Sequence, residues 1–303
     1  MKQFLLTAIF CLSTFAGPAH AQVSTVDWAA SFSDHYLMYP DRQYGFASGV
    51  PLKLDVWQAQ TTRSVPTVIY IHGGGWLFGD RAGAVVLMMP WLARGWNVVN
   101  VEYRMSGTAP APAAVEDARC ALRWVYRNAK EYHLDTDRII VTGHSAGGHL
   151  ALMTGMLRPE DGLDNNCPAD PTLDVPMKVS AIVQFYGISD VAGLLDGPDR
   201  KTYAVEWLGG QINREAIAKQ VSPLTYVRPD LPPILSIHGD HDPVVPYTDS
   251  VRLHEALTKA HVPNELYTVH GGQHGQFGAA ADIAAYQEVW KFLAANVPSL
   301  GLK

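Results

Sequence analysis

A serine in a glycine-rich run is the residue whose surroundings indicate chemistry most clearly. Ser145 lies in the run Gly143-His144-Ser145-Ala146-Gly147, between a β-branched apolar stretch and an apolar helical pattern. A strand that passes directly into a helix must turn sharply, and only small residues two positions away leave room for that turn. The sequence therefore predicts a nucleophile elbow, which holds the Ser145 hydroxyl clear of a sheet.

A serine hydroxyl is a weak nucleophile until a base removes its proton, so Ser145 needs a histidine that a carboxylate orients. We expect His274 as the base and Asp242 as the acid, because each lies in a polar loop after a predicted strand. Asp240 competes for the acid role, although the first carboxylate of a Gly-Asp-x-Asp turn often caps the turn's own amides. His270 competes for the base role, although it lies at the strand end with less freedom to reach over the sheet.

A second glycine-rich loop offers backbone amides for the negative charge that forms during acyl transfer. The first strong predicted strand is followed by His72-Gly73-Gly74-Gly75-Trp76, where glycines let the backbone approach a ligand closely. We assign the amides of Gly74, Gly75 and Ala146 to an oxyanion hole. The alternative is a flexible loop without a binding role.

Motifs for nucleotides and metals are missing from the sequence. Neither G-x-G-x-x-G nor G-x-x-x-x-G-K-[ST] occurs, and the 12 histidines and 3 cysteines include no H-E-x-x-H and no paired cysteine spacing. We interpret His72, His144 and His149 as hydrogen-bonding residues of loops and helix starts. The expectation is an enzyme that uses no metal and no cofactor.

Length and composition indicate one large domain with a substantial core. The chain has 303 residues, of which 48% are hydrophobic and 17% are charged. The formal net charge is -6 and the pI is near 6.0, and no Lys/Arg-dense stripe is present that would neutralise phosphates. We therefore expect a small, uncharged or weakly charged substrate and no nucleic-acid partner; the composition carries no prediction of oligomeric state.

The first residues have the pattern of an export signal. Lys2 supplies the positive start, Phe4 to Ala16 the apolar stretch, and Ala19-His20-Ala21 the small-residue cleavage site. This apolar stretch is shorter than the roughly 20 residues that a membrane-spanning helix needs. We predict a signal peptide over 1–21, one mature domain over 22–303, no stable membrane anchor, and a periplasmic or secreted protein.

Two cysteines remain after removal of such a signal, in a compartment that permits disulfides. Helical spacing places Cys120 off the apolar face of its predicted helix, so we expect it to face outward, within reach of a loop residue such as Cys167. A bridge between Cys120 and Cys167 and two free thiols both remain open. The change in mass on reduction distinguishes them.

Hydrophobic patterning predicts alternating strands and helices. Leu52 to Val56 alternates like a half-buried strand near a sheet edge, whereas later apolar runs are nearly continuous, as in parallel strands covered on both faces. Those runs are Val65 to Ile71, Asn97 to Tyr103, Arg138 to Thr142, Val179 to Phe185, Pro233 to His238 and Glu265 to Val269. Helical patterns cover Ala82 to Arg94, Ala114 to Tyr132, Ala146 to Leu157, Thr248 to His261 and Ala279 to Asn296. The expected fold class is α/β, a doubly wound, mostly parallel sheet with its active site at the carboxyl ends of the strands.

Two stretches interrupt this alternation. Residues 158–177 are rich in Pro, Asp and Asn, and residues 187–231 separate two predicted strands by far more than a usual connection. We interpret both as lid or rim segments within one domain. Trp76, Tyr186 and Trp207 are candidates for an aromatic mouth suited to sugar or hydroxycinnamoyl groups, although aromatic side chains are equally common as packing.

The motifs together resemble a known group of enzymes. The His72 to Trp76 loop, the Ser145 run, the turn Gly239 to Pro246 and the His274 segment are similar, in this order, to those of α/β-hydrolase-fold esterases of the His-Gly-Gly-Gly type. This group includes hormone-sensitive-lipase-like carboxylesterases and related bacterial feruloyl and acetyl esterases. The resemblance implies the α/β-hydrolase fold with a small lid insertion, and it implies the same nucleophile, base, acid and oxyanion-hole residues as the argument from the motifs. Many relatives carry a long helical cap before the first core strands, and the short segment before Val65 favours the smaller feruloyl or acetyl esterase branch.

The predicted activity is hydrolysis of carboxylic esters through an acyl-enzyme on Ser145. The expected substrates are small acyl, acetylated-sugar or feruloyl esters. Two alternatives remain: a serine peptidase or amidase, which uses the same triad, and a non-catalytic binding module on the same fold. Turnover of aryl esters against aryl amides separates the two enzymes, and an organophosphonate adduct on Ser145 separates either enzyme from the binding module.

Overall fold

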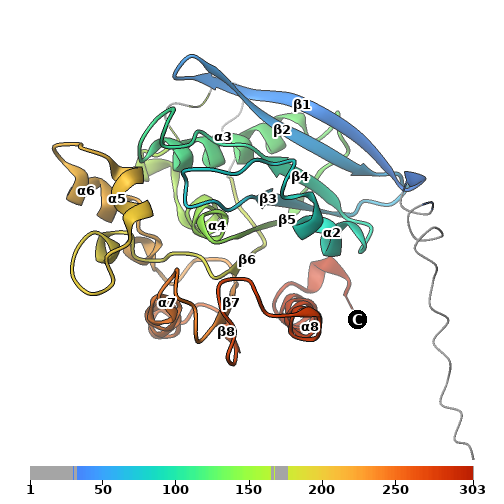
Figure 1. Ribbon diagram of the computed structural model, residues 1–303. Helices are drawn as coiled ribbons and strands as arrows, with labels where there is room; N and C mark the ends of the chain where they lie inside the picture. Colours follow the sequence, from blue (N-terminus) through green and yellow to red (C-terminus); the bar gives the residue numbers. More distant parts are fainter. Residues whose placement is uncertain (1–29, 31–32, 165–166, 168–176, 303) are drawn as a thin grey trace, which may run out of the picture. The chain divides into compact units, whose positions relative to one another are not determined.

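A twisted sheet with helices on both faces forms the framework of the protein (Figure 1). The computed structural model describes residues 30, 33–164, 167 and 177–302, and His35–Lys303 form one compact unit, to which the following description refers. The predicted signal peptide over 1–21 lies outside the described residues, as does much of the candidate lid segment 158–177.

The sheet has eight strands in the order β1-β2-β4-β3-β5-β6-β7-β8. β1 pairs antiparallel with β2, β2 pairs antiparallel with β4, and every neighbouring pair from β4 to β8 is parallel. The prediction of a doubly wound, mostly parallel sheet is confirmed. The strands are β1 (Tyr36–Ala47), β2 (Val50–Ala59), β3 (Pro66–Ile71), β4 (Asn97–Val101), β5 (Asp135–His144), β6 (Ala181–Phe185), β7 (Ile234–Gly239) and β8 (Asn264–Val269).

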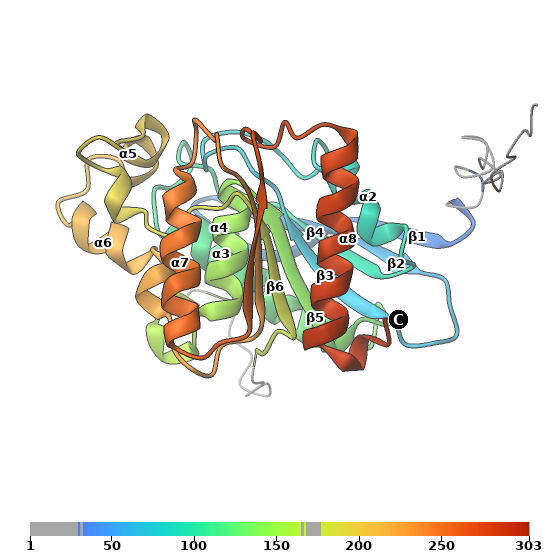
Figure 2. The same ribbon diagram turned by 90° about the horizontal axis from the view of Figure 1, so that it is seen from below.

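The helices divide between the two faces of the sheet (Figure 2). α2 and α8 lie on one face, and α3, α4 and α7 lie on the other, with α5 and α6 as a small outer group on that second side. Their bounds are α2 (Val85–Leu92), α3 (Ala113–Asn128), α4 (Ala146–Met156), α5 (Thr202–Leu208), α6 (Arg214–Gln220), α7 (Tyr247–Lys259) and α8 (Ala279–Asn296). Each helix predicted from the sequence is present, with ends that differ by a few residues.

The pattern analysis missed β1. Pro40 interrupts this strand, Asp41 has a positive φ of 57°, and the register with β2 shifts between Tyr39 and Arg42. Such a bulge removes the regular alternation on which strand prediction depends. The turn into β2 is tight because Ser48 and Gly49 both have positive φ, as two-residue hairpin turns require.

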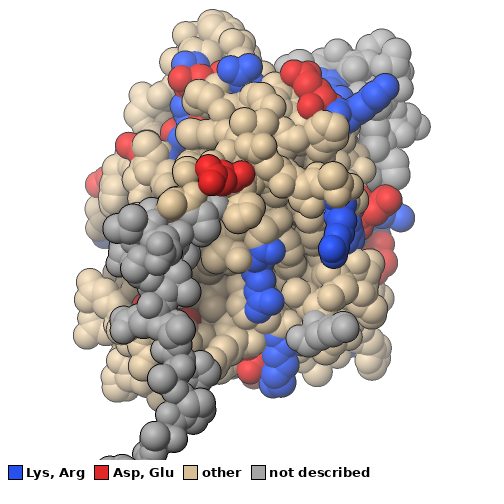
Figure 3. Space-filling model, turned by 90° about the vertical axis from the view of Figure 1, so that its right-hand side faces the viewer, with Lys and Arg blue, Asp and Glu red and all other residues tan. Residues whose placement is uncertain are grey.

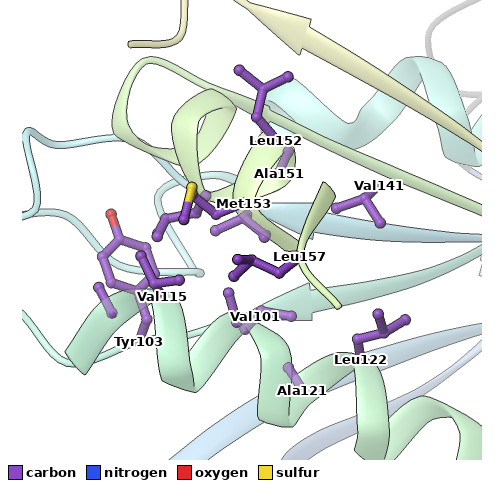
Figure 4. Close-up of a cluster of buried hydrophobic side chains, with 14 of the residues drawn as sticks. Val101, Tyr103, Val115, Ala121, Leu122, Val141, Ala151, Leu152, Met153 and Leu157 are labelled. Carbon is purple, nitrogen blue, oxygen red and sulfur yellow. The ribbon is translucent and has the colours of Figure 1, made fainter. Parts of the chain in front are cut away.

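The core lies between the sheet and its helices (Figure 4). Val115 and Leu122 of α3 and Met153 of α4 are fully buried, and they pack with Val101 of β4 and Val141 of β5. Burying one side chain of this size contributes roughly 1.5–3 kcal/mol. This packing fixes the helix that begins directly after Ser145 against the strands that carry the neighbouring loops.

The inserted segment 187–231 rests on a buried aromatic stack. Trp207 of α5 lies parallel to Trp76, with ring centroids 4.0 Å apart and an interplanar angle of 13°. The Trp76 indole N–H donates to His149 Nδ1 at 3.3 Å, and the other nitrogen of His149 lies 2.7 Å from the Val221 carbonyl oxygen. The insertion is therefore joined directly to α4, the helix that follows Ser145.

A disulfide joins Cys120 of α3 to Cys167, with 5.1 Å between the Cα atoms. The expectation that Cys120 faces outward is wrong, because its side chain is only 5% exposed. Asp164, close to Cys167 in the sequence, forms a buried ion pair with Arg119 of α3 at 2.9 Å. This polar face of α3 is therefore covered where Asp164 and Cys167 contact it, which helical spacing alone does not predict.

Charged side chains are interspersed on the face of the molecule drawn in Figure 3. Lys and Arg alternate there with Asp and Glu, and uncharged residues form most of the coloured surface. Among the described residues, none of the helices combines the length and apolar character needed to cross a bilayer.

Candidate active site

Ser145 is the single residue between the end of β5 and the start of α4. Its φ of 56° and ψ of -122° are unusual for a residue with a side chain. A Cβ atom placed on Gly143 or on Gly147 would overlap the carbonyl oxygen of Ile71. Glycine at both positions therefore allows β3 to lie close to the turn, and the turn presents the Ser145 hydroxyl at the carboxyl end of the sheet.

The structure brings Ser145, His274 and Asp242 into one series of hydrogen bonds. His274 Nε2 lies 2.9 Å from Ser145 Oγ, and His274 Nδ1 lies 2.7 Å from Asp242 Oδ2. Because the carboxylate can only accept, Nδ1 carries a hydrogen and Nε2 is free to accept from the serine hydroxyl. The His274 side chain is 20% exposed and the Asp242 side chain 0%, so the series runs from solvent into the protein.

Backbone and side-chain donors surround the Asp242 carboxylate. Oδ1 accepts from the amides of Val244 at 2.7 Å and Val245 at 3.0 Å, and Oδ2 lies 3.2 Å from His238 Nε2 as well as beside His274. Burial alone would raise the pKa of Asp242, but the hydrogen bonds from His238 and His274 lower that pKa below its usual range. Asp242 is therefore a carboxylate at neutral pH. The sequence argument missed His238, because a histidine within an apolar strand reads as core.

The competing pair, Asp240 and His270, lies on the same two loops without touching Ser145. His270 Nδ1 is 2.9 Å from Asp240 Oδ2, and the other oxygen of Asp240 accepts from the Gly271 amide at 2.6 Å. These contacts join the loop after β7 to the loop after β8. Asp240 therefore contacts His270, away from Ser145, whereas Asp242 contacts His274, the histidine beside Ser145.

The predicted oxyanion-hole residues lie beside Ser145. Gly74 and Gly75 have positive φ values of 119° and 59°, and within the described part of the chain their amides meet no acceptor. Ala146 is the first residue of α4, where a helix leaves its amides unpaired. The Tyr103 hydroxyl donates to the His72 carbonyl oxygen at 3.1 Å, which fixes the loop from behind. These free donors suit an anion that forms on a substrate bound at Ser145.

A cavity of about 590 Å³ opens over Ser145 and His274. Its other walls are mainly apolar and include Phe78, Leu87, Tyr186, Tyr203 and Val244. Tyr186, as predicted from the sequence, lies at the cavity, and its ring packs edge-on against His274 with centroids 4.6 Å apart. Apolar walls of this kind suit an uncharged group.

The sequence prediction for Trp76 and Trp207 is wrong, because both side chains are 0% exposed and neither lines the cavity. Trp76 has a positive φ of 61°, which residue type alone does not predict, and its ring stacks on Trp207 of α5. The residue of α5 that reaches the cavity is Tyr203. Its hydroxyl donates to the Val244 carbonyl oxygen at 3.1 Å, so it joins the insertion to the loop of Asp242.

Two other histidines near Ser145 are held neutral. Burial lowers the pKa of His144 to about 3, with a smaller contribution from His274, and lowers the pKa of His149 to about 4. His144 stacks on Phe185 at 4.3 Å and hydrogen bonds to the Tyr70 hydroxyl at 2.9 Å. Both fit the interpretation as structural residues. Within the residues that the structure describes, no three His, Cys, Asp or Glu side chains converge as metal ligands would.

Known sequences similar to this chain include one family model and several esterases. The family model described as BD-FAE matches residues 54–257, more than half of the chain. Esterase LipQ of Mycobacterium tuberculosis is 29% identical over 237 residues, which cover 76% of this chain and 55% of LipQ. The probable carboxylic ester hydrolase LipM of the same organism is 30% identical over 224 residues, 67% of this chain and 47% of LipM. The chain thus spans about half the length of these curated relatives.

Solved structures show the same architecture. A truncated carbohydrate esterase from gut microbiota superposes with a TM-score of 0.71 at 28% identity, covering 83% of this chain and 95% of that one. Esterase 2 of Thermogutta terrifontis with bound propionate superposes with a TM-score of 0.68 at 29% identity, covering 84% and 93%. The predicted α/β-hydrolase fold is confirmed.

Proposed function

Because the chain belongs to the BD-FAE family, we propose that it is a serine-dependent carboxylic ester hydrolase. The observation that carries this proposal is the series Ser145, His274 and Asp242, with distances of 2.9 Å and 2.7 Å, beside unpaired amides. The similarity to esterase LipQ and to the probable carboxylic ester hydrolase LipM gives independent support.

The geometry suggests the following reaction. Ser145 Oγ attacks the ester carbonyl carbon while its proton passes to His274 Nε2, and Asp242 stabilises the imidazolium that forms. The bond to the alcohol oxygen then breaks, and Nε2 returns the proton to that oxygen. A water molecule then gives a proton to His274 Nε2 and attacks the carbonyl carbon of the acyl-enzyme. The bond to Ser145 Oγ breaks, Nε2 returns the proton to Oγ, and the carboxylic acid is released.

The glycine loop supplies the electrostatic part of the mechanism. Gly74, Gly75 and Ala146 are proposed to donate their amides to the carbonyl oxygen as it becomes an oxyanion. Removing one donor of this kind typically lowers the rate by about 10²- to 10³-fold.

Small acyl, acetylated-sugar or feruloyl esters are the proposed substrates. The cavity of about 590 Å³ has room for a short acyl or aryl group, and its walls carry few charges. The names of two solved neighbours, a carbohydrate esterase and an esterase with bound propionate, support the same range.

Covalent labelling tests this proposal. A fluorophosphonate should form one adduct, on the peptide that contains Ser145, and Ser145→Ala should abolish both the adduct and the hydrolysis of 4-nitrophenyl acetate. An unlabelled Ser145 in folded protein would contradict the proposal that the protein is a serine hydrolase. Comparing acetyl, butyryl and feruloyl esters, acetylated xylosides and a matched anilide then ranks the substrate classes, and preference for the anilide would indicate an amidase.

Export completes the proposal. We propose that residues 1–21 are removed and that the mature protein is periplasmic or secreted, and the disulfide between Cys120 and Cys167 is of the kind that oxidising compartments maintain. Mature protein recovered from outside the cytoplasm should begin at Gln22. An uncleaved N-terminus would contradict this.

A further inference from the structure

The hydrogen-bond series of the active site continues past Asp242 into a buried histidine. His238 belongs to β7, and its side chain is 0% exposed. Its Nε2 lies 3.2 Å from Asp242 Oδ2 and 3.2 Å from the Val245 carbonyl oxygen, and its Nδ1 lies 2.7 Å from Ser250 Oγ on α7. The ring thus connects α7 to the loop that carries Asp242.

These contacts fix which nitrogen of His238 carries the hydrogen. A carboxylate oxygen and a carbonyl oxygen can only accept, so Nε2 must donate. In the neutral ring, Nδ1 then accepts from the Ser250 hydroxyl. The edge of the Tyr247 ring lies against the same imidazole, with centroids 5.6 Å apart. Among the described residues, Asp242 and Tyr247 are the titratable groups in contact with the ring.

Asp242 Oδ2 therefore lies between two imidazoles. His274 donates from the side of Ser145 at 2.7 Å, and His238 donates from the interior at 3.2 Å. The other oxygen is held by the Val244 and Val245 amides. A buried carboxylate is stable only when it is hydrogen bonded, and a neutral donor meets this need without adding a positive charge that would compete with His274 for the carboxylate.

We propose that His238 is a positioning residue of the esterase, which holds Asp242 Oδ2 in line with His274 Nδ1. This inference rests on the proposed function, since it assigns a role within that reaction. His238 touches no reacting atom and acts through Asp242.

Two substitutions distinguish a hydrogen bond from residue 238 to Asp242 from a role of this side chain in packing alone. In His238→Gln the amide nitrogen reaches the position of Nε2 and still donates to Asp242, whereas in His238→Asn the shorter amide reaches only the position of Nδ1, next to Ser250. We expect kcat to fall by about 10- to 100-fold in His238→Asn, since small displacements of a catalytic array have effects of this size. His238→Gln should stay within about threefold of the unchanged protein.

The pH profile is the readout that a packing role would not change. Loss of the His238 donor removes one of the hydrogen bonds that lower the pKa of Asp242, so the carboxylate attracts the proton on His274 Nδ1 more strongly. The acidic limb of kcat/KM should therefore move to higher pH in His238→Asn and stay in place in His238→Gln. The rate of fluorophosphonate labelling at Ser145 should show the same order.

A matched control is available on α7. His254 is also buried, and it hydrogen bonds to Ser236 and Asn264 at 2.7 Å and 2.8 Å rather than to the acid. His254→Asn should lower stability and leave the acidic limb unchanged. An equal loss in both His238 variants, or an unmoved limb in His238→Asn, would overturn the proposal.

His238→Leu keeps the test decisive if His238→Asn fails to fold. Leucine fills the buried position without a donor for Asp242, so the limb should again move to higher pH. An unmoved limb in folded His238→Leu would also overturn the proposal. If the unchanged protein neither hydrolyses esters nor takes up the phosphonate, the proposed function fails and this inference fails with it; if it does both, only the His238 results decide.

Discussion

Two histidine–aspartate pairs connect the same two loops, and they have very different surroundings. His270 and Asp240 lie 2.9 Å apart, with side chains that are 87% and 26% exposed. His274 and Asp242 lie 2.7 Å apart, with side chains that are 20% and 0% exposed. The residue types and the contact are the same, so neither explains a difference in chemistry.

The surroundings of the second pair explain the difference. Asp242 is buried with donors on both oxygens, and the free nitrogen of His274 meets Ser145. Asp240 accepts one amide and an exposed imidazole. A charge contact at the surface is weakened by water, whereas a buried one keeps both its direction and its strength. A histidine beside an aspartate is therefore weak evidence of catalysis until the burial of the pair and the third partner are known.

Replacing each histidine gives the largest expected difference between the pairs. His274→Gln should lower kcat by about 10⁴-fold or more, because the general base is lost, and His270→Gln should stay within about twofold. Initial rates on 4-nitrophenyl acetate, corrected for spontaneous hydrolysis, measure both. Similar losses in the two variants would remove the distinction.

Replacing each aspartate by asparagine should have the next largest effect. Asp242→Asn should lower kcat by about 10³- to 10⁴-fold, because the amide no longer holds His274 in the tautomer that accepts from Ser145. Asp240→Asn should change kcat less than threefold. The same assay applies, and circular dichroism controls for folding; an active Asp242→Asn would assign the acid role to another residue.

Buried histidines that contact no carboxylate extend the comparison to the pH dependence of the free energy of unfolding. Burial lowers the pKa of His144 to about 3 and the pKa values of His149 and His254 to about 4, so each is neutral when folded and takes up a proton on unfolding below the ordinary value near 6.5. The contribution of these histidines to the free energy of unfolding should therefore be independent of pH above that value. It should decrease as the pH drops toward 4, by about 1.4 kcal/mol per pH unit for each histidine.

Urea unfolding between pH 7 and 5 measures this slope. His149→Gln should reduce this slope by about 1.4 kcal/mol per pH unit, because one histidine fewer takes up a proton on unfolding. A stability that does not depend on pH over this range would contradict neutral burial of these residues.

The smallest expected effect concerns the stability of the exposed pair. His270→Gln should leave the thermal midpoint within about 1 °C, because exposed ion pairs contribute little. Differential scanning calorimetry checks this, and a large decrease would show that the pair does fasten the two loops.

The sequence was sufficient to predict that most strands of the sheet are parallel. It also predicted the turn at Ser145 and the glycine loop that contains Gly74. Each depends on a local signal: a continuous apolar run, or glycine where the backbone leaves no space. The pairing of His274 with Ser145 followed from placement at strand ends, which sequence order gives approximately.

Other features depended on tertiary contacts that local patterns do not contain. α5 and α6 are short helices, α5 packs through Trp207 on Trp76, and β1 contains a bulge at Pro40. The direction in which Trp76 points depends on a positive φ, which residue type alone does not predict. His238 was missed for a related reason, since burial of a polar ring becomes informative only once its partners are known.

The fixed attachment of α5 has a consequence for altering this protein. Trp207 holds the helix from its inner side, and Tyr203, four residues earlier, faces the hollow where a substrate would lie. Selectivity and architecture are thus assigned to different side chains of one short helix. Variation at position 203 can reshape what is admitted while the tryptophan keeps the scaffold intact, which makes this helix a natural place for engineering new acyl preferences.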